Sequence, residues 1–118
     1  MSNTVRKDRG IIILTMRGPQ QYKDIVSTGE ALTRHANDGT IDRLVVDLTA
    51  MGYPDVGSRR AALQVALRLQ YKHVALIRNG SSLNNALVLF IARQSGHVRE
   101  IEVFSSREAA VEWLRKGE

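Results

Sequence analysis

The sequence predicts an α/β domain in which a mainly parallel β-sheet is covered by helices and preceded by an N-terminal β-hairpin. Three features favour this fold. Short β-branched apolar runs alternate with longer segments whose apolar residues recur at helical spacing. After the hairpin, successive strands lie about 30 residues apart with a helix between them, which implies right-handed crossovers and parallel pairing. The strands are continuous apolar runs, as expected when both faces of a sheet are covered.

The N-terminal hairpin is predicted from two strand-like segments and the turn between them. Residues 4–7 form a short candidate strand, and residues 11–16 form a β-branched run. Residues 8–10 are Asp-Arg-Gly and have the chemistry of a tight turn. Residues 18–19 are Gly-Pro and are expected to end the second strand.

The first helix is expected over residues 21–37, where apolar side chains recur at helical spacing. Gly29 lies inside this helix and weakens it, and Gly39 can adopt the left-handed conformation that ends it. Residues 43–48 then form a buried strand around Leu-Val-Val. Residues 49–57 contain a proline and glycines and are expected to form a loop.

Two further strands and three further helices are predicted after that loop. Residues 58–69 have one apolar helical face, and residues 71–77 form the next strand. Residues 78–82 are a tight connection whose serines can cap the following helix. That helix extends to Gly96, and residues 100–104 form the last strand. In the final helix, a tryptophan is expected to anchor the helix on the sheet.

The composition is that of one globular domain, expected to span residues 1–118. The chain has no cysteine, which excludes disulfides and thiolate metal sites. Its formal net charge is +5, but the basic residues are scattered and aromatic residues are few, so nucleic-acid binding is not indicated. No apolar run approaches the roughly 20 residues that span a bilayer, and no signal-peptide core is present at the N-terminus. We therefore expect no integral membrane segment and a cytoplasmic location.

Three segments carry a family resemblance. Residues 44–49 are a hydrophobic strand that ends in Asp-Leu-Thr, residues 74–77 are a second such strand, and residues 103–114 contain Val-Phe, Glu-Ala and Trp-Leu. Together they resemble the STAS domain family, and most closely its stand-alone bacterial SpoIIAA-like (STAS/SEC14-like) proteins. The resemblance covers nearly the whole chain and implies a SpoIIAA-like (β/α)4 domain that acts through regulation and protein–protein interaction.

One position departs from that family. Its anti-sigma factor antagonists are phosphorylated on a serine that directly follows an aspartate. A placement without gaps puts Asp55 on this aspartate and Val56 on the serine, and valine cannot accept phosphate. Ser58 is the remaining candidate phospho-acceptor, although a residue at this position more often caps a helix. The departure argues against a phosphorylation switch.

Polar residues in two connections form a candidate site for a small anion or a protein partner. In an open parallel sheet, ligands bind beyond the carboxyl ends of the strands, and the N-terminus of a helix there favours an anion. A turn followed by a helix cap explains the second connection equally. The candidate residues are Asp47, Thr49, Asp55, Ser58, Arg59, Arg78, Asn79, Gly80, Ser81 and Ser82.

Residues 83–91 are unusually apolar, with seven apolar residues in nine. Seven such residues cannot all lie on one stripe of a helix. The helix is therefore deeply buried, or its spare face contacts a second subunit or a lipid. We expect a homodimer formed through this helix. The alternative, implied by the lipid-transfer relatives of the family, is a pocket for an apolar ligand.

No catalytic, metal or cofactor site is indicated. The three histidines, His35, His73 and His97, lie far apart in the sequence, and no serine lies in a Gly-x-Ser-x-Gly motif. The predicted function is a non-enzymatic regulatory or protein-interaction module with an unknown protein partner and an anion site at the strand ends. The alternative is a small-ligand or lipid-binding protein related to SEC14-like domains.

Overall fold

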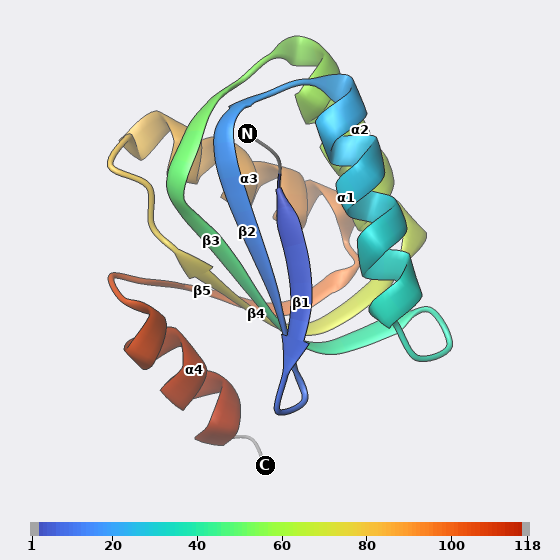
Figure 1. Cartoon of the computed structure of the whole chain (residues 1–118), viewed down its shortest axis with the longest axis vertical. Helices are drawn as coiled ribbons and strands as arrows, with labels where there is room; N and C mark the ends of the chain where they lie inside the picture. The colour runs from blue at the N-terminus through green and yellow to red at the C-terminus, as the bar shows by residue number, and fades with distance from the viewer. Residues whose placement is uncertain (1–2, 117–118) are drawn as a thin grey trace.

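The computed structural model describes residues 3–116, so residues 1–2 and 117–118 of the predicted domain lie outside the described range. Strands and helices alternate in the predicted order (Figure 1). The elements are β1 (Thr4–Asp8), β2 (Ile11–Gln20), α1 (Tyr22–His35), β3 (Thr40–Pro54), α2 (Val56–Arg68), β4 (Gln70–Ile77), α3 (Ser82–Ser95), β5 (Val98–Phe104) and α4 (Arg107–Lys116). From β2 onward, the chain consists of four strand-and-helix units.

The five strands form one sheet in the order β1-β2-β3-β4-β5. β1 pairs antiparallel with β2, and the other three pairings are parallel. One row of paired residues runs across the parallel strands, from Leu14 through Val46 and Leu76 to Val103. The predicted hairpin and the mainly parallel sheet are confirmed.

The sequential strand order decides where the helices lie. Crossovers of the same hand that all step in the same direction place their helices on the same face of the sheet. α1, α2 and α3 share one face in this way, whereas α4 lies on the opposite face (Figure 1). No strand follows α4 within the described range, and α4 packs back across β3, β4 and β5. Helices therefore cover both faces of the central strands.

Each face of the sheet has its own buried core. The larger core joins Leu14, Val46 and Leu76 of the strands to Ile25 and Leu32 of α1. These side chains alternate along each strand with those of the opposite face, as the twofold period of a strand requires. Both faces are apolar, which explains the continuous apolar runs in the sequence.

The smaller core lies beneath α4. Val45 and Ala75 are fully buried there, and Leu114 packs against the same cluster. The Trp113 ring lies 5.5 Å from the Phe104 ring at the end of β5. Trp113 thus anchors the last helix on the sheet, as predicted from the sequence.

Two tight turns contain residues with positive φ. Arg9 and Gly10, between β1 and β2, have φ values of 51° and 82°. A two-residue type I′ hairpin turn requires positive φ at both positions. Asp38 and Gly39 have φ values of 50° and 74° where the chain turns from α1 towards β3. Both turns were expected from their sequences.

The loop predicted over residues 49–57 is wrong, because β3 continues to Pro54 beside β2. Gln20 pairs with Pro54 at the end of this ladder, which contains two register shifts. Gly52 makes this close approach possible, since a Cβ atom on it would lie 2.8 Å from the backbone nitrogen of Pro19. The glycine and prolines here therefore mark an irregular strand pairing rather than a loop.

The helix predicted from residue 58 begins two residues earlier, at Val56. Asp55 caps it, because its carboxylate accepts a hydrogen bond of 2.7 Å from the N–H of Ser58. The cap supplies an acceptor to one of the N–H groups that a helix start leaves without a partner. Val56 thereby becomes a helix residue that is 64% exposed.

Candidate functional site

The candidate site residues fall into three hydrogen-bonded groups. The extended β3 strand separates Asp47 and Thr49 from Asp55 and Ser58, which lie at the start of α2. Residues 78–82 form the third group, directly after β4. Each group is bonded mainly to its own neighbours in the fold.

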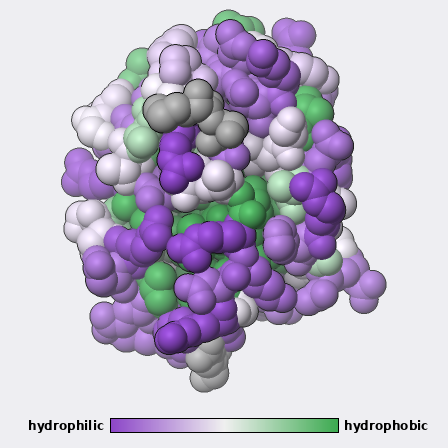
Figure 2. Space-filling view, in the orientation of Figure 1, coloured by the Kyte–Doolittle hydropathy of each residue, from purple (hydrophilic) through white to green (hydrophobic). Residues whose placement is uncertain are grey.

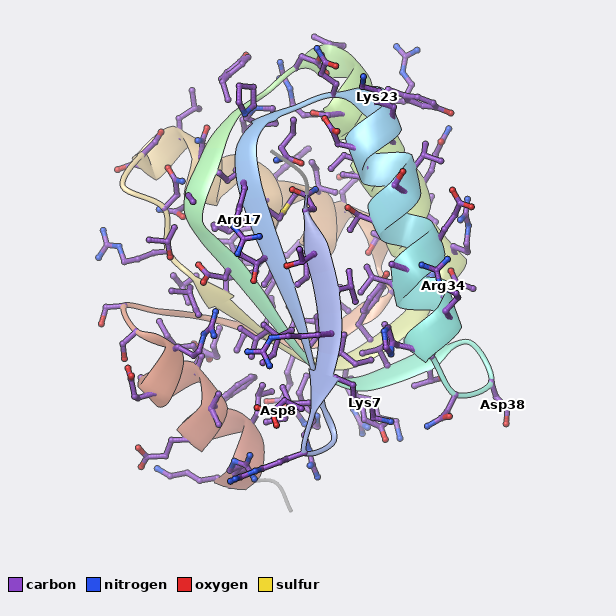
Figure 3. The ribbon with its side chains drawn as sticks, viewed as in Figure 1. Lys7, Asp8, Arg17, Lys23, Arg34 and Asp38 are labelled. Carbon is purple, nitrogen blue, oxygen red and sulfur yellow. The ribbon has the colours of Figure 1, made fainter. Side chains whose placement is uncertain are left out.

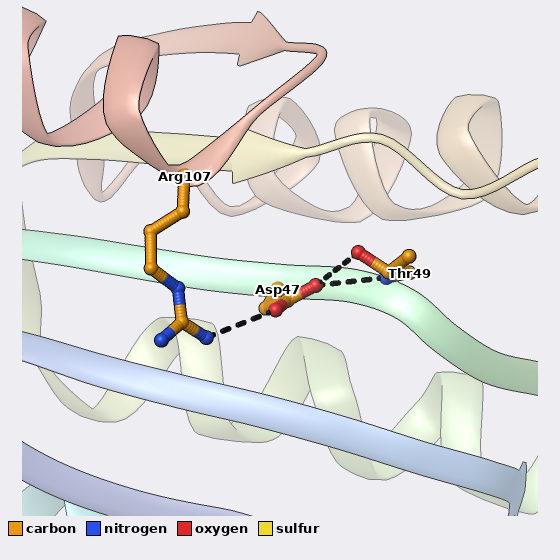
Figure 4. Close-up of polar contacts among 3 residues, drawn as sticks. All are labelled: Asp47, Thr49 and Arg107. Carbon is orange, nitrogen blue, oxygen red and sulfur yellow. Dashed lines mark hydrogen bonds and ion pairs between the residues drawn. The ribbon is translucent and has the colours of Figure 1, made fainter.

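Asp47 lies on β3 beside the start of α4. Its carboxylate accepts hydrogen bonds from the backbone and the hydroxyl of Thr49 and from Arg107, whose Nη2 lies 3.1 Å away (Figure 4). Partial burial raises the pKa of Asp47, but the hydrogen bonds from Thr49 and Arg107 outweigh it and hold the pKa below its usual value. Arg107 is not among the residues predicted from the sequence, because it lies 60 residues further along the chain than Asp47. This carboxylate ties α4 to the sheet.

Asp55 and Ser58 bond to each other in the first turn of α2. The Ser58 hydroxyl donates to the Asp55 carbonyl oxygen at 2.9 Å, and Ser58 is only 1% exposed. The next residue, Arg59, lies 5.6 Å from the centre of the Tyr53 ring and donates to the Tyr53 hydroxyl at 3.0 Å. Phosphorylation of Ser58 would require this turn to open. The expectation that Ser58 does not act as a phosphorylation switch stays a prediction.

Asn79 joins the connection after β4 to the end of β3. Its buried side-chain amide donates to the carbonyl oxygens of Leu48 and Met51 at 2.6 and 2.9 Å. Its side-chain oxygen accepts from the N–H of Ser81 at 2.8 Å. The Ser81 hydroxyl in turn caps α3 by accepting from the N–H of Asn84 at 3.3 Å. Several groups expected to cradle an anion are therefore bonded within the protein.

Apart from Ser81, which caps α3, the exposed members of this connection are Arg78, Gly80 and Ser82. The space beside Gly80 is open, since a Cβ atom on it would meet no atom of the described residues within 4 Å. An anion at this loop would depend on these three residues and on the free N–H groups of the first turn of α3. Anion binding here stays a prediction.

An apolar surface on α2 and α3 is the most exposed feature of the helical layer. Val56, Leu83 and Phe90 are 64%, 60% and 63% exposed. The buried residues of α3 are Asn84 and Ser95, so none of its apolar side chains is fully buried. Of the two arrangements left open by the sequence, the structure therefore shows a spare apolar face. A groove between the two helices, here called the α2–α3 groove, is lined by residues including Val56, Arg60, Leu63, Leu87, Phe90 and Ile91.

The charged residues within the two helices of this groove are all basic, and the acidic cap Asp55 lies just before α2. α2 carries Arg59, Arg60 and Arg68, α3 carries Arg93, and neither helix contains an acidic residue. Arg60 and Arg93 are exposed, and the buried Nε–H of Arg59 has no hydrogen-bond partner among residues 3–116. The scattered basic residues of the sequence thus include four that the fold gathers on two neighbouring helices.

The face formed by β1, β2 and α1 differs from the α2–α3 surface because its exposed side chains are mostly hydrophilic. Figure 2 shows a mostly hydrophilic surface in this view, with a smaller hydrophobic area near its centre. The labelled side chains of Lys7, Asp8, Lys23, Arg34 and Asp38 extend from the hairpin, from α1 and from the turn after α1 (Figure 3). Arginine and lysine alternate with aspartate here, which is typical of a solvated surface.

An apolar cavity of about 150 Å³ lies between the sheet and the helices α1, α2 and α3. The hydroxyls of Thr28 and Tyr71 border it, but they donate to the carbonyl oxygens of Asp24 and Val65 at 2.8 and 3.2 Å. Burial raises the pKa of Tyr71 to about 12, so its hydroxyl keeps its proton at neutral pH. Because both hydroxyls already donate their protons to backbone carbonyl oxygens, neither is available to donate to a ligand. The cavity therefore offers a ligand an apolar environment.

The histidines do not form a joint site. His73 Nε2 lies 2.9 Å from Glu100 Oε1 on the neighbouring strand, whereas His97 Nδ1 lies 3.1 Å from the Leu69 carbonyl oxygen. Among residues 3–116, no group of three or more His, Asp or Glu side chains is arranged to hold a metal ion. None of the helices described for the same residues combines the length and apolar character needed to cross a bilayer.

The arrangement of the strands and helices matches that of a solved structure. An uncharacterised protein of the DUF3478 family from Shewanella loihica PV-4, described as having a SpoIIAA-like fold, aligns with a TM-score of 0.72 and 16% sequence identity. The alignment covers 96% of this chain and 92% of that chain. No family model and no curated protein matches the sequence. The SpoIIAA-like fold predicted from the sequence is confirmed.

Proposed function

We propose that this chain is a non-enzymatic STAS-type module that regulates a protein partner by binding it through the α2–α3 groove. The observation that carries the proposal is the exposure of Val56, Leu83 and Phe90 on two adjacent helices. Large apolar side chains that cluster on a surface mark interaction sites, whereas single ones are common on any protein. The SpoIIAA-like fold agrees with such a role but does not by itself assign it.

The polar residues at the strand ends support binding rather than catalysis. A catalytic site needs a nucleophile beside a base and room for a substrate. The Ser58 hydroxyl is buried and donates to a backbone carbonyl, and the Asp47 carboxylate is occupied by Thr49 and Arg107. The side-chain nitrogen of Asn79 donates to the carbonyl oxygen of Leu48, and its side-chain oxygen accepts from the N–H of Ser81. Asn79 thereby joins the end of β3 to the connection before α3. These side chains stabilise the fold around the proposed binding surface.

The test compares partners recovered from cells of the protein's own host. The tagged chain would carry Phe90→Glu, and the control would carry Glu112→Lys on the exposed face of α4. We expect at least one protein to co-purify with the unmodified chain and with the control but to be lost with Phe90→Glu. Identical recovery with both variants, at matched thermal stability, would contradict the proposal.

A second candidate function is the binding of a small apolar molecule in the cavity between the sheet and the helices. An apolar cavity of about 150 Å³ is large enough for a molecule the size of benzene. Ala62 and Ala92 line the cavity, so Ala62→Leu or Ala92→Leu should fill part of it. Native mass spectrometry of protein purified from its host should then show an apolar ligand on the unmodified chain and less on the filled variants. Absence of any ligand from the unmodified chain would exclude this candidate.

A further inference from the structure

We propose that the occupant of the α2–α3 groove is an acidic amphipathic helix of the partner protein. The inference rests on the proposed function and adds to it the chemistry of the partner. It follows from the shape of the groove, from the purely basic charge of the two helices that form it, and from the poor fit of a second copy of the chain.

The shape of the groove favours a helix. Leu63 of α2 and Leu87 and Ile91 of α3 line it from both sides. Two packed helices leave a channel that accepts one ridge of apolar side chains, as in other helix-in-groove complexes. The 13 residues of α2 extend about 20 Å. A partner helix of about four turns, with apolar residues three and four positions apart, would match this length.

The charge around the groove selects an acidic helix. Arg60 lines the groove, and Arg93 lies beyond Phe90 in the neighbouring hollow on α3. Both arginines are exposed, and neither helix has an acidic side chain to neutralise them. Glutamate or aspartate beside the apolar ridge of a partner would meet these guanidinium groups. Complementary charges of this kind contribute more to partner choice and association rate than to affinity.

A second copy of this chain fits less well. A twofold contact brings the same surface of both copies together, so the arginines of α2 and α3 from both copies would gather at one interface that has no acidic residue on either helix to offset them. A flat anionic bilayer would neutralise them, but Leu63, Leu87 and Ile91 lie inside the groove, where an inserted helix makes more contact. A dimer and a lipid surface therefore become outcomes of the test.

The experiment uses the full chain and two synthetic peptides of about 14 residues, long enough for four helical turns. Both peptides share one leucine stripe, and their remaining positions are glutamate in one and lysine in the other. Binding would be measured by fluorescence anisotropy at about 0.1 M salt, where attraction between charges in contact across the interface is only partly screened. We expect the acidic peptide to bind about tenfold more tightly than the basic one, and Phe90→Glu to abolish this binding.

Charge reversal sharpens the test. The double variant Arg60→Glu/Arg93→Glu should reverse the preference towards the basic peptide. The matched control, Arg34→Glu/Arg99→Glu, makes the same change in net charge at exposed positions outside the groove and should keep the preference for the acidic peptide. Circular dichroism would confirm that all variants fold.

Several results would overturn the inference. Equal affinity for both peptides would do so, as would a preference unaffected by Arg60→Glu/Arg93→Glu. A dimer dissociated by Phe90→Glu would assign the groove to a second copy. Binding to phosphatidylglycerol vesicles but not to the acidic peptide would assign it to a membrane. If Phe90→Glu still loses the host partner while the peptides bind equally, the proposed function stands and the acidic helix is excluded.

Discussion

The guanidinium of Arg107 donates to the carboxylate of Asp47 across 3.1 Å, and this ion pair joins the first turn of α4 to β3. The Asp47 side chain is 15% exposed, and that of Arg107 is 43% exposed. Elsewhere α4 is held by apolar packing, with Ala110 and Leu114 buried against the sheet. The pair therefore adds a polar contact between the first turn of α4 and the sheet.

Replacing Asp47 by asparagine should destabilise the protein. Since Arg107 is partly solvated, screening limits the loss in the free energy of unfolding to about 1 kcal/mol. The matched control is Asp42→Asn, which removes an exposed pair with Lys72 at 3.4 Å and should cost less than about 0.5 kcal/mol. Urea unfolding of both variants measures the difference, and equal losses would contradict a structural role for Asp47.

The contribution of Asp47 should depend on pH. Its pKa is lower in the folded state than in the unfolded state, so the folded protein binds fewer protons as the carboxyl group titrates. The stabilisation is then fully present above the unfolded pKa of about 3.9 and is lost as the pH falls through the folded pKa. The stability difference between the unmodified chain and Asp47→Asn should shrink below about pH 4. If the difference in the free energy of unfolding between the two proteins stayed constant from neutral to acidic pH, the pKa of Asp47 would not be lower in the folded state.

Replacing Asn79 by alanine should be more damaging. The change leaves the buried carbonyl oxygens of Leu48 and Met51 and the N–H of Ser81 without their partner. Buried polar groups that lose a partner cost about 1–3 kcal/mol each, although the losses are not additive. Thermal and urea unfolding should show a loss of about 2 kcal/mol or more. Gln64→Ala, on the exposed face of α2, is the control and should be nearly neutral.

Gly29 should be required by the packing of α1 against α2. A Cβ atom on Gly29 would lie 2.6 Å from Cγ2 of Val65. Gly29→Ala should therefore destabilise the protein by about 1–2 kcal/mol through overpacking, even though alanine favours a helix. In a Val65→Ala background the same substitution should cost little, because the obstructing methyl group is gone. Equal costs in both backgrounds would refute the steric explanation.

The fold was predictable because its signals are local. The buried runs of β2, β3 and β4 and the helical spacing between them set the order of the elements, and the Asp-Arg-Gly turn fixed the hairpin. The continuation of β3 to Pro54 was missed because Gly52 and Pro54 have loop chemistry. Their strand pairing depends on the approach of Pro19 from a distant segment, which no local pattern reveals.

The site was less predictable, because a polar side chain does not reveal what it will bond to. Asn79 was identified as a candidate ligand-binding residue, but in the fold its amide meets the carbonyl oxygens of Leu48 and Met51. The partner of Asp47 lies 60 residues away in the sequence. The spare apolar face of α3 was detectable from its composition, whereas Val56 was missed because the helix start was placed two residues too late.

Photo-crosslinking from position 90 in living cells tests the proposed function most directly. A photoreactive amino acid would replace Phe90 on α3, and a control chain would carry it in place of Glu112 on α4. We predict a discrete protein adduct from position 90 and none from position 112. Adducts of the same kind from both positions, or none from position 90 at normal expression, would contradict the account of α2 and α3 as a protein-binding surface.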